Sequence, residues 1–253
     1  MKVLIIGEVC EDVFIYGDVN RLSPEAPIPI IEPKLQTINK GMAGNVQSNL
    51  SALGVESKLI CNVEIMKKIR YVDDSYNYIL LRIDENNKVL NVDTKLIFEL
   101  EDKFDAIVIV DYDKGFLTED NISEISKKFK CPIFMDTKKI LGNWCRDVDF
   151  IKVNYSEYLK SETFIKNQEW IKNKLIVTRG KYGCDYNNKN YPTQDVSIKD
   201  VAGAGDTFLS GLIFKYIQST SIEESIEFAN LCSTQVVQKR GVSVINKNLL
   251  YEK

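Results

Sequence analysis

The chain has 253 residues, a formal net charge of −3 and no histidine. The small net charge gives no reason to expect nucleic acid or a membrane surface as a partner, and the lack of histidine excludes Ser-His-Asp triads and His-ligated zinc sites. None of the six cysteines forms a CxxC pair, so we expect core thiols in a reducing compartment.

The N-terminal part predicts a strand, an exposed ribbon and a helix. The apolar run at 2–8 predicts a buried strand, because it is too short for a membrane span and no signal-peptide cleavage pattern follows it. We therefore expect a cytoplasmic protein. Residues 14–33 are rich in proline and turn residues and alternate like an exposed ribbon. A helix is predicted over 43–54, where Gly54 is a stop signal.

Most of the remaining chain alternates short apolar runs with helical patterns, which predicts a parallel sheet covered on both faces. Residues 77–92 are an exception, because they fit a strand, a turn and another strand at the rim of the sheet. We expect one α/β domain over residues 1–253 with a small β appendage. Further strands are predicted at 57–63, 106–111, 132–136, 150–154 and 175–180, and helices at 117–129 and 221–239, capped by Thr118 and Ser221.

The stretch "DVAGAGDTFLSG" (200–211) places three small residues before Asp206 and then continues into an apolar helix. The first N–H groups of a helix lack internal partners, and Gly203 and Gly205 leave them uncovered. The helix dipole favours an anion there. The pattern favours phosphoryl transfer, in which the amides hold the phosphoryl group and Asp206 accepts the proton of the attacking hydroxyl. From this stretch alone, a glycine loop that merely joins a strand to a helix is an equal alternative.

Motifs along almost the whole chain resemble those of the ribokinase-like (pfkB) carbohydrate kinases. Besides "DVAGAGDTF", they are "YGDVNRLSPEAPIPII" (16–31), "GMAGNVQSNLSALG" (41–54), "LLRIDENN" (80–87), "VDYDKGFLT" (110–118), "MDTKK" (135–139), "KVNYSEY" (152–158), "IVTRG" (176–180) and "FANLCSTQVVQKRG" (228–241). The set is most similar to kinases that phosphorylate D-glycero-D-manno-heptose 7-phosphate at O1. The resemblance implies a three-layer α/β/α sandwich with a mostly parallel central sheet and a small β-sheet lid over residues 14–38.

The resemblance also implies ATP and Mg²⁺ as cofactors, and it assigns roles position by position. Asp206 matches the catalytic base, and the backbone of residues 202–205 matches the anion hole, through Gly203, Ala204 and Gly205. Asn154 and Glu157 match an N-x-x-E element that positions phosphates and, through water, Mg²⁺, which suits a hard cation. Nucleotide contacts are expected from Asn154, Lys138, Thr178, Gly180, Asn230 and Ser233. Acceptor contacts are expected from Asp12, Gly41, Gly44, Asn45, Arg82, Asp111 and Lys114.

Ordinary structural roles stay open for several of these residues. The N-x-x-E spacing also suits a strand-end cap followed by a helix start, and Asn230 and Ser233 also fit the polar spacing of an amphipathic helix. Arg82 and Lys114 could meet an acceptor phosphate, although surface ion pairs are the commoner use of such residues. Lys138 is equally compatible with a solvated surface position.

The chain departs from the family in its length. The missing unit falls between "LICNVE" (59–64) and "KKIRYVDD" (67–74), where relatives carry a further helix and a strand or two. Met42 stands where a glycine is expected, and Ala202 where threonine is frequent. An exposed ribbon needs pairing or protection, so we expect a homodimer through the lid.

Three functions are consistent with these observations. The first is an ATP- and Mg²⁺-dependent sugar kinase, with heptose 7-phosphate as the favoured acceptor. The second is a kinase of the same fold for another sugar or a nucleoside. The third is a non-catalytic sugar- or nucleotide-binding regulatory homologue. The partner is a small-molecule acceptor in the first two cases, and no nucleic acid or membrane partner is expected in any of them.

Overall fold

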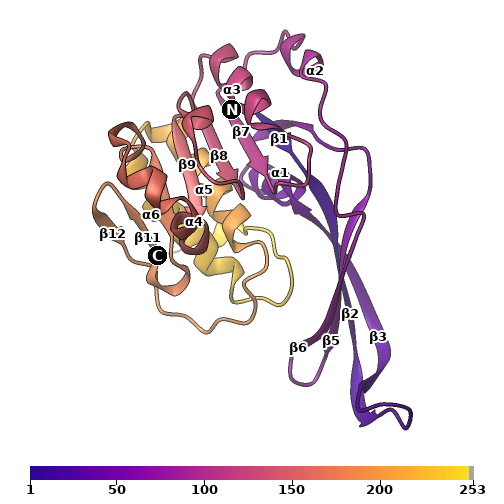
Figure 1. Cartoon of the computed structure of the whole chain (residues 1–253). Coiled ribbons are helices and arrows are strands. Elements are labelled where there is room, and N and C mark those ends of the chain that lie inside the picture. Colours follow the sequence, from indigo (N-terminus) through magenta and orange to yellow (C-terminus); the bar gives the residue numbers. More distant parts are fainter. Residues whose placement is uncertain (251–253) are drawn as a thin grey trace.

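The structure is a computed structural model that describes residues 1–250. Two β-sheets organise the chain (Figure 1): an eight-stranded sheet in the order β12-β11-β10-β9-β8-β7-β1-β4, and a four-stranded sheet in the order β3-β2-β5-β6 that projects away from it. We call the four-stranded sheet the lid sheet and the rest the body. The body strands are β1 (Lys2–Gly7), β4 (Glu56–Ile60), β7 (Ala106–Asp111), β8 (Ile133–Thr137), β9 (Phe150–Asn154), β10 (Leu175–Thr178), β11 (Cys184–Tyr186) and β12 (Lys189–Tyr191).

The lid strands are β2 (Val9–Leu22), β3 (Pro29–Met42), β5 (Met66–Asp73) and β6 (Tyr78–Glu85).

Helices cover both faces of the body sheet. The helices are α1 (Ala43–Ala52), α2 (Lys95–Phe98), α3 (Glu119–Lys128), α4 (Tyr155–Lys166), α5 (Ala204–Ser219) and α6 (Ile222–Val236). Short 3₁₀ turns occur at Asn143–Cys145, Glu169–Ile171, Gly180–Tyr182 and Lys247–Leu250.

The body sheet is parallel from β4 through β10, and β11 and β12 add an antiparallel edge. Strands covered on both faces are continuous apolar runs, as β1 and β7 are. Val3 and Ile5 belong to the hydrophobic cluster that holds residues of α1, α5 and α6, whereas Leu4 and Ile6 belong to the cluster under α3 and α4. The predicted α/β/α sandwich with a mostly parallel sheet is confirmed.

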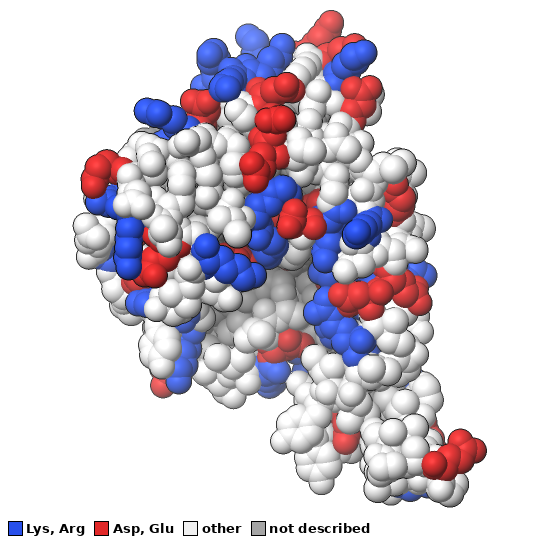
Figure 2. Space-filling view, viewed as in Figure 1, with Lys and Arg blue, Asp and Glu red and all other residues white. Residues whose placement is uncertain are grey.

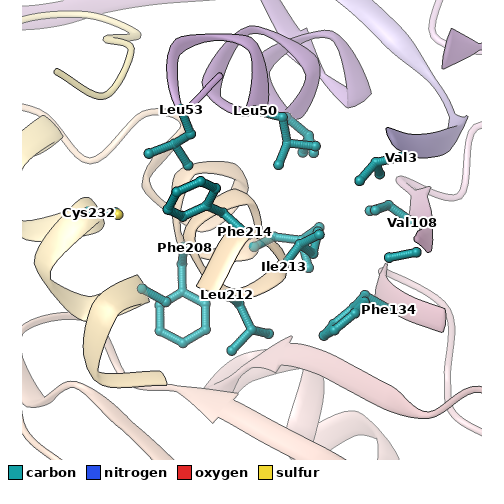
Figure 3. Packing of buried hydrophobic residues seen from close by; sticks show 14 of the residues in the cluster. Val3, Leu50, Leu53, Val108, Phe134, Phe208, Leu212, Ile213, Phe214 and Cys232 are labelled. Carbon is teal, nitrogen blue, oxygen red and sulfur yellow. The ribbon is translucent and has the colours of Figure 1, made fainter. Parts of the chain in front are cut away.

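Helix α5 lies at the centre of one layer (Figure 3). Its residues Leu212, Ile213 and Phe214 are fully buried, between Leu50 of α1 and Val108 of the sheet. Because α1, α6 and the sheet all pack against this helix, the position of its N-terminus is fixed relative to the carboxyl ends of the strands.

The lid sheet is larger than the ribbon predicted over 14–38. β2 and β3 pair in antiparallel fashion, β5 joins β2 in parallel, and β6 pairs in antiparallel fashion with β5. On the face turned toward the body, Phe14 and Tyr16 pack with Ala202 and Val242. The lid sheet therefore contacts the segment that leads into α5.

The second strand predicted within residues 77–92 is wrong. β6 ends at Glu85, and Asn86 has a φ of 51°, which turns the chain away. The backbone N–H of Val89 donates instead to the carbonyl of Lys114, outside the lid sheet. β6 pairs with β5, whose closely spaced charges conceal its strand period in the sequence.

The predicted helix starts are confirmed. Thr118 and Asn121 form a capping box at α3, and the Ser221 hydroxyl accepts the Glu224 N–H at 3.3 Å at the start of α6. Within residues 1–250, no helix combines the length and the apolar character that crossing a membrane requires.

Candidate active site

A cavity of about 670 Å³ lies at the carboxyl ends of the body's parallel strands, where open α/β sheets bind ligands. β8, β9 and β10 contribute to one wall, and the start of α5 with part of α6 contributes to another. Figure 2 shows a hollow between the body and the lid sheet, with basic and acidic side chains around it. The cavity lining brings together the predicted residues Gly203, Ala204, Gly205, Asp206, Lys138, Asn154, Thr178, Gly180, Asn230 and Ser233.

The N-terminus of α5 has no side-chain cap. Gly203 occupies the cap position in the left-handed region, with a φ of 76°. A Cβ at Gly203 would lie 2.5 Å from Nδ2 of Asn45, and a Cβ at Gly205 would lie 2.9 Å from Nζ of Lys152. The N–H of Ala204 donates to the carbonyl of Val201 at 3.2 Å. The two glycines leave the next amides, those of Gly205 and Asp206, without a side-chain cap and let these two side chains approach.

Asp206 is buried in the first turn of α5. Its Oδ1 accepts the Tyr112 hydroxyl at 2.8 Å, and its Oδ2 accepts the Asn45 amide at 3.1 Å. Burial, reinforced by the charge of Asp136, raises the pKa of Asp206 to about 6, although the two hydrogen bonds act in the opposite direction. A carboxyl group with this pKa is mostly ionised at neutral pH and can accept a proton.

A buried lysine–aspartate cluster lies beside this carboxylate. Asp136 accepts Nζ of Lys152 at 2.6 Å and lies 3.4 Å from Nζ of Lys138. Burial disfavours the charge of Asp136, but the two lysines outweigh it and hold the pKa of Asp136 below its ordinary value. Buried ion pairs are weak sources of stability. Because all three residues line the cavity, we infer that the cluster places two ammonium groups on the cavity wall.

The N-x-x-E pair forms the helix cap that its spacing also suggested. Asn154 and Glu157 make a capping box at α4, with hydrogen bonds of 2.9 Å and 2.7 Å between each side chain and the other residue's backbone N–H. Lys138 lies 2.6 Å from Oε1 of Glu157. Both carboxylate oxygens of Glu157 already accept hydrogen bonds, so Mg²⁺, which keeps most of its waters, would be held here only through those waters. The metal role of both residues stays a prediction.

The predicted nucleotide residues surround the other end of the cavity. The Thr178 hydroxyl donates to the Val153 carbonyl at 3.3 Å. Asn230 donates to the carbonyl of Tyr191 at 3.0 Å, and Ser233 donates to that of Ala204 at 3.1 Å. These polar groups therefore also support the fold. The apolar part of the lining is Val196, Ile198, Val201, Phe208 and Val237, which suits a flat aromatic base.

The acceptor residues predicted on the lid sheet lie on its body-facing side. Asp12 accepts the Arg70 guanidinium at 2.6 Å, and Gly41 leaves space for this carboxylate because a Cβ there would collide with it. Asp84 accepts two hydrogen bonds from Arg82, at 2.6 and 2.8 Å. Both predicted side chains thus form ion pairs within the lid sheet.

Helix α1 starts next to the same region. A Cβ at Gly44 would lie 3.0 Å from Cβ of Lys40, so the start of α1 packs closely against β3. Asn45 was expected to contact the sugar; in the structure its amide donates to Asp206.

None of the seven predicted acceptor residues lines this cavity, and Asp111 and Lys114 lie outside the lid sheet as well. Asp111 is fully buried, where one oxygen accepts the Thr137 hydroxyl at 2.5 Å and the other accepts Nζ of Lys139 at 2.8 Å. The carboxylate of Asp111 forms an ion pair with Lys139, because a buried charge requires a partner of opposite sign close by. The backbone N–H of Lys114 donates to Glu8 at 3.0 Å, which fixes the loop after β7.

The lining residues that the sequence did not single out include three polar residues near Asp206: Tyr112, Asp136 and Lys152. Two of them carry a usable signal, because Asp136 and Lys152 are single charges within otherwise apolar strands. A buried charge needs a partner of opposite sign. A buried aspartate in one strand and a buried lysine in the next therefore indicate an ion pair between the two. Tyr112 follows β7 in a loop and lies within the motif at 110–118, but nothing in that motif indicates that its hydroxyl contacts Asp206.

Comparisons with known proteins agree with this geometry. Residues 124–248 match the family model described as pfkB family carbohydrate kinase. The chain is 28% identical over 295 positions to the bifunctional protein HldE of a Nitratiruptor species, and 29% identical over 294 positions to that of Yersinia enterocolitica. These alignments cover 96% of this chain but only 62% and 61% of those two proteins. The alignments span more positions than the 253 residues of this chain, so both relatives carry additional residues inside the aligned region.

Solved structures show the same fold at low sequence identity. The nucleoside kinase of Methanocaldococcus jannaschii, an archaeal member of the ribokinase family, has a TM-score of 0.69 at 17% identity, with 98% of this chain and 94% of that chain covered. Phosphofructokinase-2 from Escherichia coli has a TM-score of 0.75 at 12% identity, with 99% and 97% covered. At these identities the likeness concerns the fold.

We expect Gly203→Ala to damage the cavity beyond its backbone strain. An alanine at position 203 must keep the positive φ of this residue, which costs about 1–2 kcal/mol. Its Cβ would also collide with the Asn45 amide and displace it from Asp206. Gly54→Ala is the matched control, because Gly54 has a φ of 84° with only Lys247 Nζ nearby, at 3.7 Å. Both variants should lose stability in urea unfolding. Calorimetric binding of AMP-PNP should weaken only in Gly203→Ala, and equal binding by both variants would contradict this account.

Proposed function

We propose that this chain is a carbohydrate kinase of the pfkB family, whose model matches residues 124–248, and that it transfers the γ-phosphoryl group of ATP to a hydroxyl of a sugar or sugar phosphate. The observation that carries the proposal is the start of α5, where uncapped backbone amides and the Asp206 carboxylate border one cavity. The amides bind the phosphoryl oxygens, and the carboxylate accepts the proton of the attacking hydroxyl.

Lys138 and Lys152 complete the phosphate side in this proposal. Their ammonium groups lie near Asp136 and line the cavity. They compensate the negative charge of the transferring group where water is excluded and charge interactions are strong. Mg²⁺ would add further compensation when bound, and Asn154 and Glu157 would hold it through waters.

The body-facing side of the lid sheet supports an acceptor with a negative group. Strand register places Lys68 between Asp12 and Asp84, and it places Arg70 beside Arg82. Three cations and two carboxylates leave this side positive. A phosphorylated sugar suits it, and the motif resemblance favours heptose 7-phosphate with transfer to O1. Closure of the lid sheet over the acceptor excludes water, which would otherwise take the phosphoryl group.

Two alternatives use the same fold. One is a kinase for another sugar or a nucleoside, and the other is a non-catalytic sugar- or nucleotide-binding regulatory homologue. The short connection between β4 and β5 favours them, because the curated relatives carry segments that this chain lacks.

A screen for ADP release across sugars, sugar phosphates and nucleosides tests the proposal. We expect turnover with a phosphorylated sugar, with heptose 7-phosphate as the best acceptor. Turnover with a different acceptor class would support the first alternative. Binding of ATP and acceptors without ADP release from any mixture would support the regulatory homologue and contradict the kinase proposal.

We expect Asp206→Asn to lower kcat by about 10²–10⁴-fold, because the amide cannot accept the proton of the attacking hydroxyl. AMP-PNP binding should persist, since the backbone amides of α5 stay in place. Asp185→Asn is a control that makes the same change in an exposed ion pair of β11, outside the cavity. Turnover near the wild-type rate in Asp206→Asn would refute the assignment of the base.

We also propose that the chain forms a homodimer through the side of the lid sheet that faces away from the body. Register aligns Ile38, Val13, Ile69 and Ile83 in one row across all four strands. Ile38 is 56% exposed and Leu81, in the neighbouring row, is 54% exposed. An apolar surface of this kind on a sheet with free edges fits a second copy of the chain.

Leu81→Glu should therefore convert the dimer to a monomer, because it places a charge in the apolar contact. Leu96→Glu in α2 makes the same change at an exposed leucine outside the lid sheet, and it should leave the dimer intact. Light scattering after size-exclusion chromatography measures the mass against the 28.9 kDa of one chain. A monomeric wild-type protein would contradict the dimer.

A further inference from the structure

Tyr112 is the cavity residue to which neither the sequence pattern nor the proposed reaction gives a role. Its hydroxyl donates to Oδ1 of Asp206 at 2.8 Å, while Asn45 donates to Oδ2 at 3.1 Å. Tyr112 follows β7 and Asn45 lies in α1, so the donors reach the carboxylate from two separate segments. Both oxygens of the carboxylate have a fixed partner, which sets the orientation of the group.

Glu8, just after β1, holds both of these segments. Its buried carboxylate accepts the backbone N–H of Tyr112 at 2.8 Å and that of Lys114 at 3.0 Å. Its carbonyl accepts the N–H of Ala43 at 2.9 Å, and Ala43 is the first residue of α1. One residue therefore anchors the loop that carries Tyr112 and the helix that carries Asn45.

The ring of Tyr112 also contacts the lid sheet and the phosphate side of the cavity. Nζ of Lys68, in β5, lies 5.0 Å from the ring centroid, and Nζ of Lys138 lies 4.9 Å from it. Ammonium groups at these distances are attracted to an aromatic face. Tyr112 is thus in contact with the lid sheet, the lysine–aspartate cluster and the carboxylate at the same time.

We propose that Tyr112 is a positioning residue that orients the Asp206 carboxylate for proton abstraction and links it to the lid sheet. This role rests on the proposed kinase function. A hydrogen bond to the ionised form favours that form, so the Tyr112 hydroxyl keeps Asp206 able to accept a proton at neutral pH. The other titratable groups that act on Asp206 are Asp136 of β8, Lys138 after it, Lys152 of β9 and Cys10 of β2.

Tyr112→Phe tests the proposal, because it removes the hydroxyl and keeps the ring. The readout is the carboxyl-carbon NMR titration of Asp206, assigned by its absence in Asp206→Asn. A hydrogen bond to a charged group is strong enough to move such a titration by about one pH unit or more. We expect the titration midpoint of Asp206 to move to higher pH by that amount. The acidic limb of the pH profile of kcat should move to higher pH with it, with little change in the KM for ATP.

Tyr186→Phe is the matched control. Tyr186 is also buried, and its hydroxyl donates to the Asn173 carbonyl at 2.9 Å, outside the cavity. This variant should leave both the Asp206 titration and the acidic limb unchanged. An unchanged Asp206 titration in Tyr112→Phe would overturn the proposal, whether or not the chain phosphorylates any acceptor. A shifted titration in a chain that phosphorylates nothing would support the contact and would contradict the kinase function alone.

Discussion

The Asp206 carboxylate must stay ionised in a buried place if it is to accept a proton, and much of the site follows from this constraint. Burial and the charge of Asp136 both favour its protonated form. Two hydrogen-bond donors oppose them, and these come from α1 and from the loop after β7. The donors lie 161 and 94 residues from Asp206 along the chain, so only the folded body brings them together. Glu8 holds both donor segments in place, although it does not line the cavity itself.

The two walls of the cavity supply different kinds of positive potential. At α5 it comes from backbone amides, which carry no formal charge and stay fixed because the helix is packed on several sides. At β8 and β9 it comes from lysines, whose charges are held in place by Asp136. In the proposed reaction a phosphoryl group between these walls would meet oriented donors on both sides, so little reorganisation would be needed when charge develops on it. The apolar residues beyond it would contact the base of the proposed nucleotide without competing for its phosphates.

The sequence allowed the body and the grouping of residues around the start of α5 to be predicted, because both depend on local patterns. Apolar runs mark the buried strands, and a glycine pair before Asp206 marks an uncapped helix. The lid sheet was harder, because β5 pairs in parallel with β2, far back along the chain, and its charges hide the strand period. Tyr112 was not singled out, because its hydrogen bond to Asp206 depends on a contact across the fold. The hydrogen bond of Asn45 to Asp206 was not expected either, because the sequence does not say which way an amide points, and the sugar contact of Asn45 stays a prediction.

The lid sheet shows how one short segment can serve two surfaces. In β5, Lys68 and Arg70 face the body, while Ile69 between them lies in the apolar row on the opposite side. The alternation of side chains along a strand makes this possible. A partner that covers the apolar side would restrict the strand, and that would also restrict the lysine that reaches the Tyr112 ring. In the proposed dimer, association of two copies would therefore act on the contact between Lys68 and the Tyr112 ring through the backbone of β5, because Ile69 and Lys68 are adjacent residues.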